Sequence, residues 1–317
     1  MTIEVLKPGA LSTFQDLGRI GHQHNGIPVS GVMDERSHRL ACMLVGNAPS
    51  QATLEVTLLG PTLKFEAPAV IAVCGADLSA TLGGNTLPLG TQVSVAAGDL
   101  LSFGKRASGL RAYIAVAGGY ALQPVMGSTS TYVRGGFGGA QGRPLQKGDR
   151  IALGPAATGT PSVDANGFMF PKEVQRPSGT PLRIVPGREW QAFEPCAHRA
   201  MAEQAFRVSP RSDRMGYRLE GEPLRLLQAL ELQSEAVSFG TVQVPPDGFP
   251  IVLMADRQTT GGYPRIANVA TVDLPRLAQV MAGDELRFEW ITLDAAQKLA
   301  VVQGEIFRMM EAGRGVH

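Results

Sequence analysis

The chain has 317 residues, of which 44% are hydrophobic and 18% charged, and its formal net charge at pH 7 is +1. This apolar content can fill one large core or two moderate ones, which excludes a chain that is disordered throughout. No block of like charge stands out, and no segment approaches the roughly 20 apolar residues that span a bilayer, so nothing supports a nucleic-acid or membrane role. Because the N-terminus lacks the basic and apolar parts of a signal peptide, we expect a cytoplasmic protein.

Thirty-eight glycines and 22 prolines separate short runs rich in Val, Ile, Leu and Thr. This pattern is typical of many strands joined by tight turns, and it predicts a mostly β fold with a few helices. Several runs are almost continuously apolar, which indicates strands buried on both faces or inside a barrel. Besides the N-terminal strand, the clearest predicted strands lie at residues 54–58, 69–74, 92–96, 100–103, 111–116, 182–185, 250–254 and 285–290.

The first loop with candidate chemistry precedes the first predicted helix. Residues 15–19 (Gln-Asp-Leu-Gly-Arg) lead into a Gly- and Pro-rich segment that brings Asp16, Arg19, Ser30 and Asp34 close together. The exposed N–H groups of a helix N-terminus favour an anion there. The composition alone favours the alternative, an elaborate turn in which Asp16 and Arg19 pair with each other.

The helices are few, and three of them have a recognisable signal at their start. Asp34 is the predicted N-cap of the first helix, and a second helix, broken by Pro195, is predicted within 189–205. Asp273 is the predicted cap of a short helix, and Thr292 opens the last one. The apolar stripe of that last helix is more typical of a docking surface than of a cofactor site, and it comprises Leu299, Val302, Ile306 and Met309.

A Gly-Asp turn that leads into a strand recurs three times, at Gly98-Asp99, Gly148-Asp149 and Gly283-Asp284. Two copies lie in the first half of the chain and one lies near its end, which suggests two related β-barrel units in tandem. The one linker-like composition falls between them, at mid-chain. We therefore predict a first barrel domain at 1–160 and a second, with a C-terminal helix, at 175–317.

A second loop with candidate chemistry starts at residues 127–131 (Gly-Ser-Thr-Ser-Thr) and continues into a glycine-rich stretch with Arg134 and Arg143. Glycines let a backbone approach a ligand closely, and the two arginines are suited to hold a carboxylate. Lys147 is followed by Gly148 rather than by Ser or Thr, so the loop is not a Walker loop and we expect no P-loop ATP site in this chain. A flexible hairpin connection explains the composition equally well.

Candidate residues are densest in the second half of the chain. Arg214 lies within 212–219 (Ser-Asp-Arg-Met-Gly-Tyr-Arg-Leu), and Gln243 closes a short strand-like run. Asp256 falls where the apolar run 250–254 gives way to a Thr- and Gly-rich loop. Such a junction is a usual place for a site that a rigid scaffold holds in position.

The predicted site combines proton handling, anion binding and hydrogen-bond donation to a carbonyl or oxyanion. Asp256 and Tyr263 are the predicted proton handlers, and Arg214 is the predicted anion grip. Turn caps remain the structural alternative for these residues. The predicted substrate-binding residues, which supply hydroxyl, amide and guanidinium donors, are Gln243, Gln258, Thr259, Thr260, Gly261, Gly262, Arg134 and Arg143.

Disulfide and metal sites are not predicted. Cys42, Cys74 and Cys196 are odd in number and far apart, which favours buried thiols over a metal clip. His22 and His24 could share one strand face, but no third ligand completes a metal set. We therefore expect chemically idle cysteines and no bound metal.

Taken together, these segments resemble the family called allophanate hydrolase subunit 2, or biotin-dependent carboxyltransferase-like proteins. The resemblance implies a cyclophilin-like fold, hence tandem cyclophilin-like β-barrels. One turn, 186–189 (Pro-Gly-Arg-Glu), departs from the family, whose members usually have Gly-Pro-Gln there. The matching segments follow one another over nearly the whole chain, at 15–19, 127–131, 213–219, 243–245 and 256–264.

The resemblance implies three alternative functions. Many free-standing members resemble the C subunit of 5-oxoprolinase, which opens 5-oxo-L-proline to L-glutamate together with the A and B subunits. Under this alternative, ATP is expected to bind a partner subunit. Members fused within urea carboxylase transfer a carboxyl group from carboxybiotin to urea. That alternative requires biotin on another chain, because no Met-Lys-Met pattern occurs here. A related regulatory protein instead binds a kinase inhibitor homologous to the B subunit.

Overall fold

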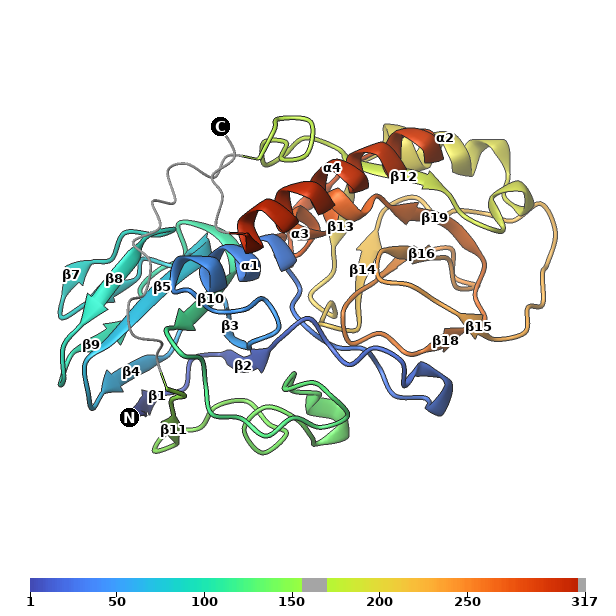
Figure 1. Ribbon diagram of the computed structural model, residues 1–317. Helices are drawn as coiled ribbons and strands as arrows, with labels where there is room; N and C mark the ends of the chain where they lie inside the picture. Colours follow the sequence, from blue (N-terminus) through green and yellow to red (C-terminus); the bar gives the residue numbers. More distant parts are fainter. Residues whose placement is uncertain (156–169, 313–317) are drawn as a thin grey trace. The chain divides into compact units, whose positions relative to one another are not determined.

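The computed structural model describes residues 1–155 and 170–312, which form many short strands and, within those ranges, four α-helices (Figure 1). The mostly β prediction is confirmed. The chain divides into two compact units: unit 1 comprises Met1–Arg19, Ser30–Met169 and Ile306–His317, and unit 2 comprises Ile20–Val29 and Phe170–Glu305. The predicted domain boundary falls partly outside the described residues, so the division into 1–160 and 175–317 stays a prediction, as does the name cyclophilin-like.

The described residues of unit 1 form two antiparallel sheets. The six-stranded sheet has, in spatial order, β11 (Arg150–Ala152), β1 (Thr2–Lys7), β4 (Thr62–Phe65), β9 (Leu100–Ser102), β6 (Thr81–Leu82) and β7 (Asn85–Thr86). The five-stranded sheet has β2 (Leu11–Gln15), β3 (Thr53–Thr57), β10 (Ser108–Val116), β5 (Ala69–Asp77) and β8 (Gln92–Val95).

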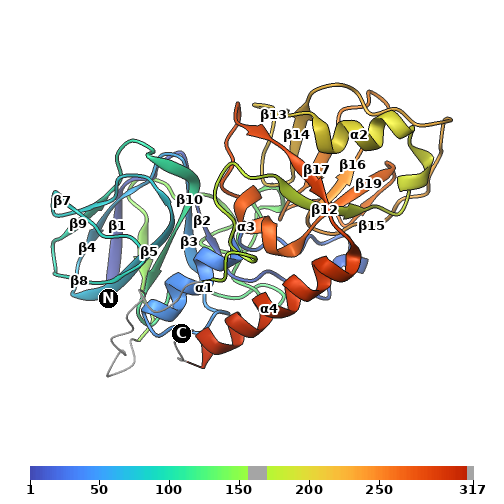
Figure 2. The ribbon, with the colours of Figure 1, turned by 90° about the horizontal axis from the view of Figure 1, so that it is seen from above.

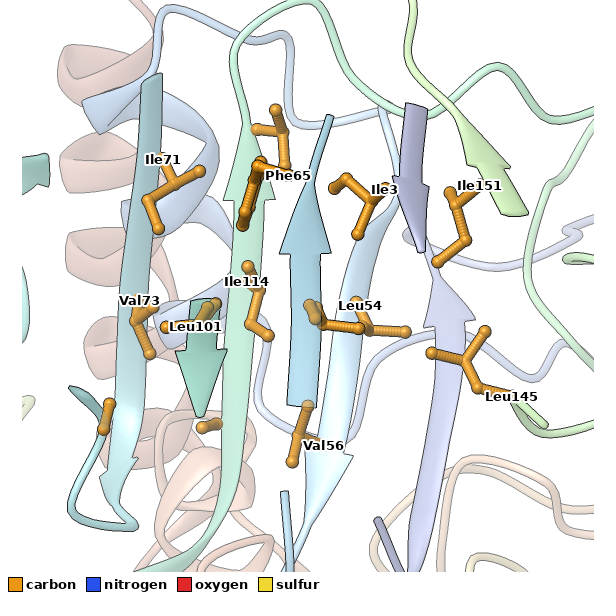
Figure 3. Close-up of a cluster of buried hydrophobic side chains, with 14 of the residues drawn as sticks. Ile3, Leu54, Val56, Phe65, Ile71, Val73, Leu101, Ile114, Leu145 and Ile151 are labelled. Carbon is orange, nitrogen blue, oxygen red and sulfur yellow. The ribbon is translucent and has the colours of Figure 1, made fainter. Parts of the chain in front are cut away.

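One hydrophobic core joins the two sheets of unit 1 (Figure 3). In β1 the burial alternates, so that Ile3 and Val5 are fully buried while Glu4 between them is not. Leu54 of β3 and Ile114 of β10 enter the same core from the other sheet. Because successive side chains of a strand point to opposite faces, one apolar face per strand is enough to build this core. Each such side chain contributes about 1.5–3 kcal/mol when it leaves water.

The Gly-Asp turn is built in the same way all three times. In each copy the glycine has a φ near +90°, which favours glycine because it has no Cβ. The aspartate Oδ2 accepts a hydrogen bond from the backbone N–H three residues earlier, at 2.8–3.0 Å, in Ala96, Gln146 and Met281. The turns lead into β9 and β11 of unit 1 and into β20 of unit 2, so all three predicted turns into strands are confirmed.

Unit 2 is organised around a sheet of eight short strands that curls into a nearly closed barrel (Figure 2). The two edge strands are separated only by Arg287, yet β20 pairs with β13 and β21 pairs with β12. The chain therefore passes from one edge of the sheet to the other at this point. The spatial order is β20 (Glu285–Leu286), β13 (Phe206–Val208), β14 (Gly216–Glu220), β17 (Ile251–Leu253), β16 (Thr241–Gln243), β19 (Arg265–Val269), β12 (Leu182–Pro186) and β21 (Phe288–Trp290).

Two helices have the caps that the sequence predicts. The carboxylate of Asp34 accepts from the N–H of Ser37 at 3.0 Å and begins α1 (Glu35–Leu44). Thr292 Oγ1 accepts from the N–H of Ala295 at 3.2 Å and begins α4 (Leu293–Glu311). The stripe predicted on α4 packs at least partly inside the protein, because Ile306 is buried and Leu299 contacts a small core of unit 2. Within the described ranges, no helix has the length and apolar character to cross a membrane.

Two helix predictions are corrected. Pro195 does not break a helix but begins α2 (Pro195–Glu203), since the first position of a helix needs no N–H donor. Asp273 does not cap α3 (Leu274–Leu277) through its side chain. Its carboxylate is instead bound by the guanidinium of Arg183, with Nε–Oδ2 at 2.9 Å and Nη2–Oδ1 at 2.8 Å. A charged partner from β12 outcompetes a local cap.

The three cysteines differ in burial, because Cys42 and Cys74 are buried whereas Cys196 is exposed, contrary to the expectation. Burial raises the pKa of the Cys42 thiol to about 12 and raises the pKa of Cys74 as well. The hydrogen bond from Cys196 to the Glu194 carboxylate raises the pKa of that thiol too. All three thiols therefore remain protonated and weakly nucleophilic at neutral pH.

Replacing Cys42, Cys74 and Cys196 together with alanine is expected to leave turnover per folded complex within about twofold of the unmodified protein, because none is an activated thiolate. The measurement is the steady-state rate divided by the concentration of folded protein, since the two buried substitutions also reduce packing. Loss of most of the turnover at normal folded concentration would contradict this expectation.

Candidate functional site

A buried ion pair fixes the start of the loop predicted to carry the site. Arg214 precedes β14 and Asp256 follows β17, and these strands are antiparallel neighbours. The guanidinium of Arg214 binds the Asp256 carboxylate with Nε–Oδ2 at 2.9 Å and Nη2–Oδ1 at 3.1 Å, and both side chains are buried. The N–H of Asp256 also donates to the carbonyl of Arg214 at 2.8 Å. Because both carboxylate oxygens are engaged, this geometry favours a positioning role over the predicted proton transfer.

The loop after Asp256 lies alongside a second segment of unit 2. Its β18 (Thr260–Gly261) pairs antiparallel with β15 (Glu235–Ala236), with Glu235 opposite Gly261 (Figure 1). The N–H of Val237 donates to the carbonyl of Thr259 at 3.2 Å and extends this pairing. Gln258 and Thr260 are exposed, so their side chains are accessible to a ligand, as the sequence predicts for donors.

Gln243 fixes the other end of the loop. Its buried amide Nε2 donates to the carbonyl of Tyr263 at 3.3 Å. A Cβ on Gly261 would lie 2.5 Å from the same nitrogen, so any other residue at this position would push the Gln243 amide aside. Tyr263 is 47% exposed. Gln243 therefore holds the loop rather than pointing freely at a ligand, whereas Tyr263 is open to one.

A cluster of four charged residues that the sequence analysis missed lies beside β15 and β19. Arg265 binds Glu189 with Nε–Oε2 at 2.7 Å and Nη2–Oε1 at 2.6 Å, and it binds Glu235 Oε2 at 2.9 Å. Arg188 is bound to the same Glu235 carboxylate. Burial alone would raise the pKa of Glu189, but the hydrogen bonds from Arg265 outweigh it and lower the pKa. The only sequence signal for this cluster was the atypical turn at 186–189.

In unit 1, the two other candidate motifs join in one buried polar cluster around Asp16. Its Oδ1 accepts from Ser128 Oγ at 2.6 Å, from Ser130 Oγ at 2.5 Å and from the N–H of Gly18 at 2.8 Å. Its Oδ2 accepts from the N–H and the Oγ1 of Thr129 at 2.6 and 3.0 Å. Burial would raise the pKa of Asp16, but these hydrogen bonds lower it.

The expected pairing between Asp16 and Arg19 does not form. Arg19 is buried, donates to the carbonyl of Ser130 and lies over the ring of Phe137, with its guanidinium carbon 4.9 Å from the ring centroid. The predicted anion position at the first helix N-terminus is occupied by the protein itself, because the Asp34 carboxylate caps that helix. The cluster therefore has a structural explanation in which two distant loops hold each other.

The two arginines predicted in the glycine-rich stretch of unit 1 differ in environment. Arg143 binds Asp149 through two hydrogen bonds of 2.8 Å, which raise the pKa of the guanidinium and lower the pKa of the carboxyl. Arg134 is exposed on a short 3-10 helix, η2 (Val133–Gly135). Both belong to unit 1, whereas Arg214, Asp256, Gln243 and the loop 258–263 belong to unit 2.

Comparison with known proteins identifies the family. Residues 25–290 match the family described as carboxyltransferase domain, subdomain A and B. The chain is 38% identical to the C subunit of 5-oxoprolinase from Escherichia coli (strain K12) over 97% of both chains, and 38% identical to its counterpart from Haemophilus influenzae over 94% of both. The crystal structure of the Kluyveromyces lactis urea carboxylase superposes with a TM-score of 0.88 at 29% identity, covering 100% of this chain but only 30% of that one. The protein therefore belongs to the carboxyltransferase domain family, subdomain A and B.

Proposed function

We propose that the chain is the C subunit of an ATP-dependent 5-oxoprolinase and acts with the A and B subunits to convert 5-oxo-L-proline to L-glutamate. The observation that carries this proposal is the 38% identity with the C subunit of 5-oxoprolinase from Escherichia coli over 97% of both chains. A match of that extent spans both units, and therefore both the loop 258–263 and the polar cluster of Asp16.

The chemistry of the substrate fits the loop of unit 2. 5-Oxoproline contains an unactivated lactam, whose ring carbonyl gains negative charge when the amide is attacked. Donors that are already oriented toward that oxygen stabilise the charge without reorganising. In this proposal the hydroxyls of Thr259 and Thr260 and the N–H groups of Gly261 and Gly262 supply these donors. The Arg214–Asp256 pair and Gln243 hold the two ends of the loop in place.

The substrate also carries a carboxylate, which needs a cationic partner. Arg143 and Arg214 are each already bound by an aspartate. Arg134, Arg143 and Arg214 are the candidates for this anion grip, and Arg134 is the exposed one of the three. ATP is proposed to bind a partner subunit, because the glycine-rich stretch of this chain lacks the Walker pattern. Tyr263, which is exposed, remains the candidate proton handler.

A second candidate function is that of the carboxyltransferase component of a urea carboxylase-like system. It is supported by the 29% identity and the TM-score of 0.88 with the Kluyveromyces lactis urea carboxylase. This chain spans less than a third of that protein, so a biotinyl carrier would have to be a separate chain. Urea has no carboxylate and gives the arginines less to bind. The 5-oxoprolinase proposal therefore accounts for more of the residues.

Reconstitution of the three subunits separates the two functions. The chain and homologues of the A and B subunits are purified, mixed singly and together, and supplied with 5-oxoproline and ATP, with and without avidin. We expect one complex of this chain with the B-subunit homologue in size-exclusion chromatography, and glutamate and ADP only when all three chains are present. Avidin is expected to have no effect. Absence of glutamate from the full set, or carboxylation of urea that avidin abolishes, would transfer the assignment to the second candidate.

A further inference from the structure

A seven-residue segment of unit 2, residues 228–234, lies against the candidate loop with little support of its own; we call it the strap. Within the described part of the chain, its backbone N–H groups donate no hydrogen bond to another residue. Leu230 is exposed, and most of the neighbouring strap residues are exposed as well. Segments with few backbone hydrogen bonds and little buried surface open at low free-energy cost.

Both ends of the strap are fixed. On its N-terminal side, the N–H of Leu227 donates to the carbonyl of Ala192 at 2.9 Å, and the N–H of Glu194 donates to the carbonyl of Arg225 at 3.0 Å. On its C-terminal side, β15 pairs with β18 of the candidate loop. This arrangement, fixed at both ends and weakly supported between them, is the one that loops acting as hinged covers have.

The strap contacts the candidate loop directly. A Cβ built on Gly262 would lie 3.3 Å from the carbonyl oxygen of Leu232 and 3.3 Å from the Oγ of Ser234. A side chain at position 262 would therefore require the strap to shift by a few tenths of an ångström. Movement of the strap changes which atoms border the backbone of Gly261 and Gly262, the amides proposed to meet a substrate carbonyl.

The four-residue charged cluster at the C-terminal end of the strap has a rigid part and a weakly held part. Arg265 and Glu189 form a two-fold hydrogen-bonded pair with side chains only 12% and 10% exposed, which makes a rigid base. The Glu235 side chain that joins this base is 42% exposed, and that of Arg188 is 68% exposed. An exposed ion pair of this kind shifts the equilibrium between an attached and a detached Glu235 side chain by no more than about fivefold. The attachment of Glu235 is thus weak enough to release.

We propose that the strap opens and closes over the loop 258–263, and that Glu235, bound by Arg188 and Arg265, is a positioning residue that favours the closed form. This rests on the proposed function in one respect, namely that the loop binds an amide or lactam substrate. The closed strap excludes bulk water from the loop amides, which strengthens their hydrogen bonds to a substrate carbonyl. The open strap admits the substrate and releases the product.

Hydrogen exchange of the free, full-length chain tests the strap without any activity. Glu235→Gln removes the charge that binds Arg188 and Arg265, and it is expected to speed exchange of the hydrogen-bonded amides that attach the strap, those of β15, β18 and Val237, by roughly two- to fivefold. Gly262→Ala inserts a methyl group under the strap and is expected to speed exchange of the same amides. Glu231→Gln changes an exposed strap residue for which no ion pair is described, and serves as the matched control with unchanged exchange. Exchange in 228–234 as slow as in β16 and β19, or equal exchange in all variants, overturns the proposal.

Kinetics of the reconstituted complex test the positioning role of Glu235. Glu235→Gln is expected to raise KM for 5-oxoproline roughly two- to fivefold while kcat falls less, whereas Glu231→Gln changes neither. If no variant and no unmodified complex releases glutamate, the proposed function fails, but the exchange result still decides the strap. If addition of the B-subunit homologue alone fully protects 228–234 and substrate adds nothing, the segment is a docking surface and the strap proposal is wrong.

Discussion

Arg214→Ala is expected to lower the free energy of unfolding by about 3 kcal/mol or more. The substitution leaves the Asp256 carboxylate buried without the guanidinium that binds both of its oxygens. An unpaired buried charge costs more than an exposed ion pair contributes, so this is one of the two largest single-residue effects that we expect. Urea denaturation followed by circular dichroism measures it, and the slope against urea should stay constant if only the native state has changed.

Two variants make the Arg214 result specific. Arg218→Ala removes an exposed arginine from the same segment and should change the free energy of unfolding by no more than about 0.5 kcal/mol. Arg214→Lys keeps the charge but not the planar fork, and it should recover only part of the loss. A destabilisation by Arg214→Ala no larger than that of Arg218→Ala would show that the pair does not anchor the loop.

Activity gives a second measure of the same pair. In the reconstituted complex, Arg214→Ala and Asp256→Asn are expected to reduce glutamate release per folded complex by about 100-fold or more, because displaced donors no longer meet the developing charge. Because the pair is buried, the substitutions also reduce stability, so the rate has to be normalised to folded protein.

Asp16→Asn is expected to destabilise unit 1 by about 3 kcal/mol at pH 7. The amide cannot accept all five hydrogen bonds that the carboxylate receives, and each hydrogen bond to a charged group contributes about 1.5–3 kcal/mol. Asp294→Asn, which breaks only an exposed pair with Lys298, is the matched control and should cost no more than about 0.5 kcal/mol.

The Asp16 effect should depend on pH in a defined direction. Because the folded-state pKa of Asp16 is lowered, its stabilisation is fully present above the unfolded-state pKa of about 3.9 and is lost as the pH falls through the folded pKa. The difference in the free energy of unfolding between the unmodified chain and Asp16→Asn is therefore largest at neutral pH and shrinks below about pH 4. A difference that stays constant from pH 7 to pH 3 would show that the Asp16 carboxylate is not the group responsible.

Local signals in the sequence were sufficient for several turns and helix caps. The cap at Asp34 and the turns at Gly98, Gly148 and Gly283 were predicted correctly, because each depends on hydrogen bonds within three residues and on a φ that glycine adopts readily. The mostly β composition and the family motifs were likewise readable without coordinates. Where a distant partner intervenes, local reasoning failed: Asp273 has the sequence position of a cap, but it binds Arg183, 90 residues away.

The partner of each charged residue was decided only by the tertiary structure. Asp16 is bound by hydroxyls more than 110 residues away, Arg214 finds Asp256 across two neighbouring strands, and Glu235 meets Arg188 and Arg265 only because β15 and β19 come together in unit 2. The charge of a side chain shows that it needs a partner but not which residue supplies it, because an ion pair can form between residues at any separation in the sequence. The sequence by itself therefore determined the mostly β class, several local turns and caps, and the family of this protein. Strand pairing determined which of the candidate residues hold the loop and which remain open to a ligand.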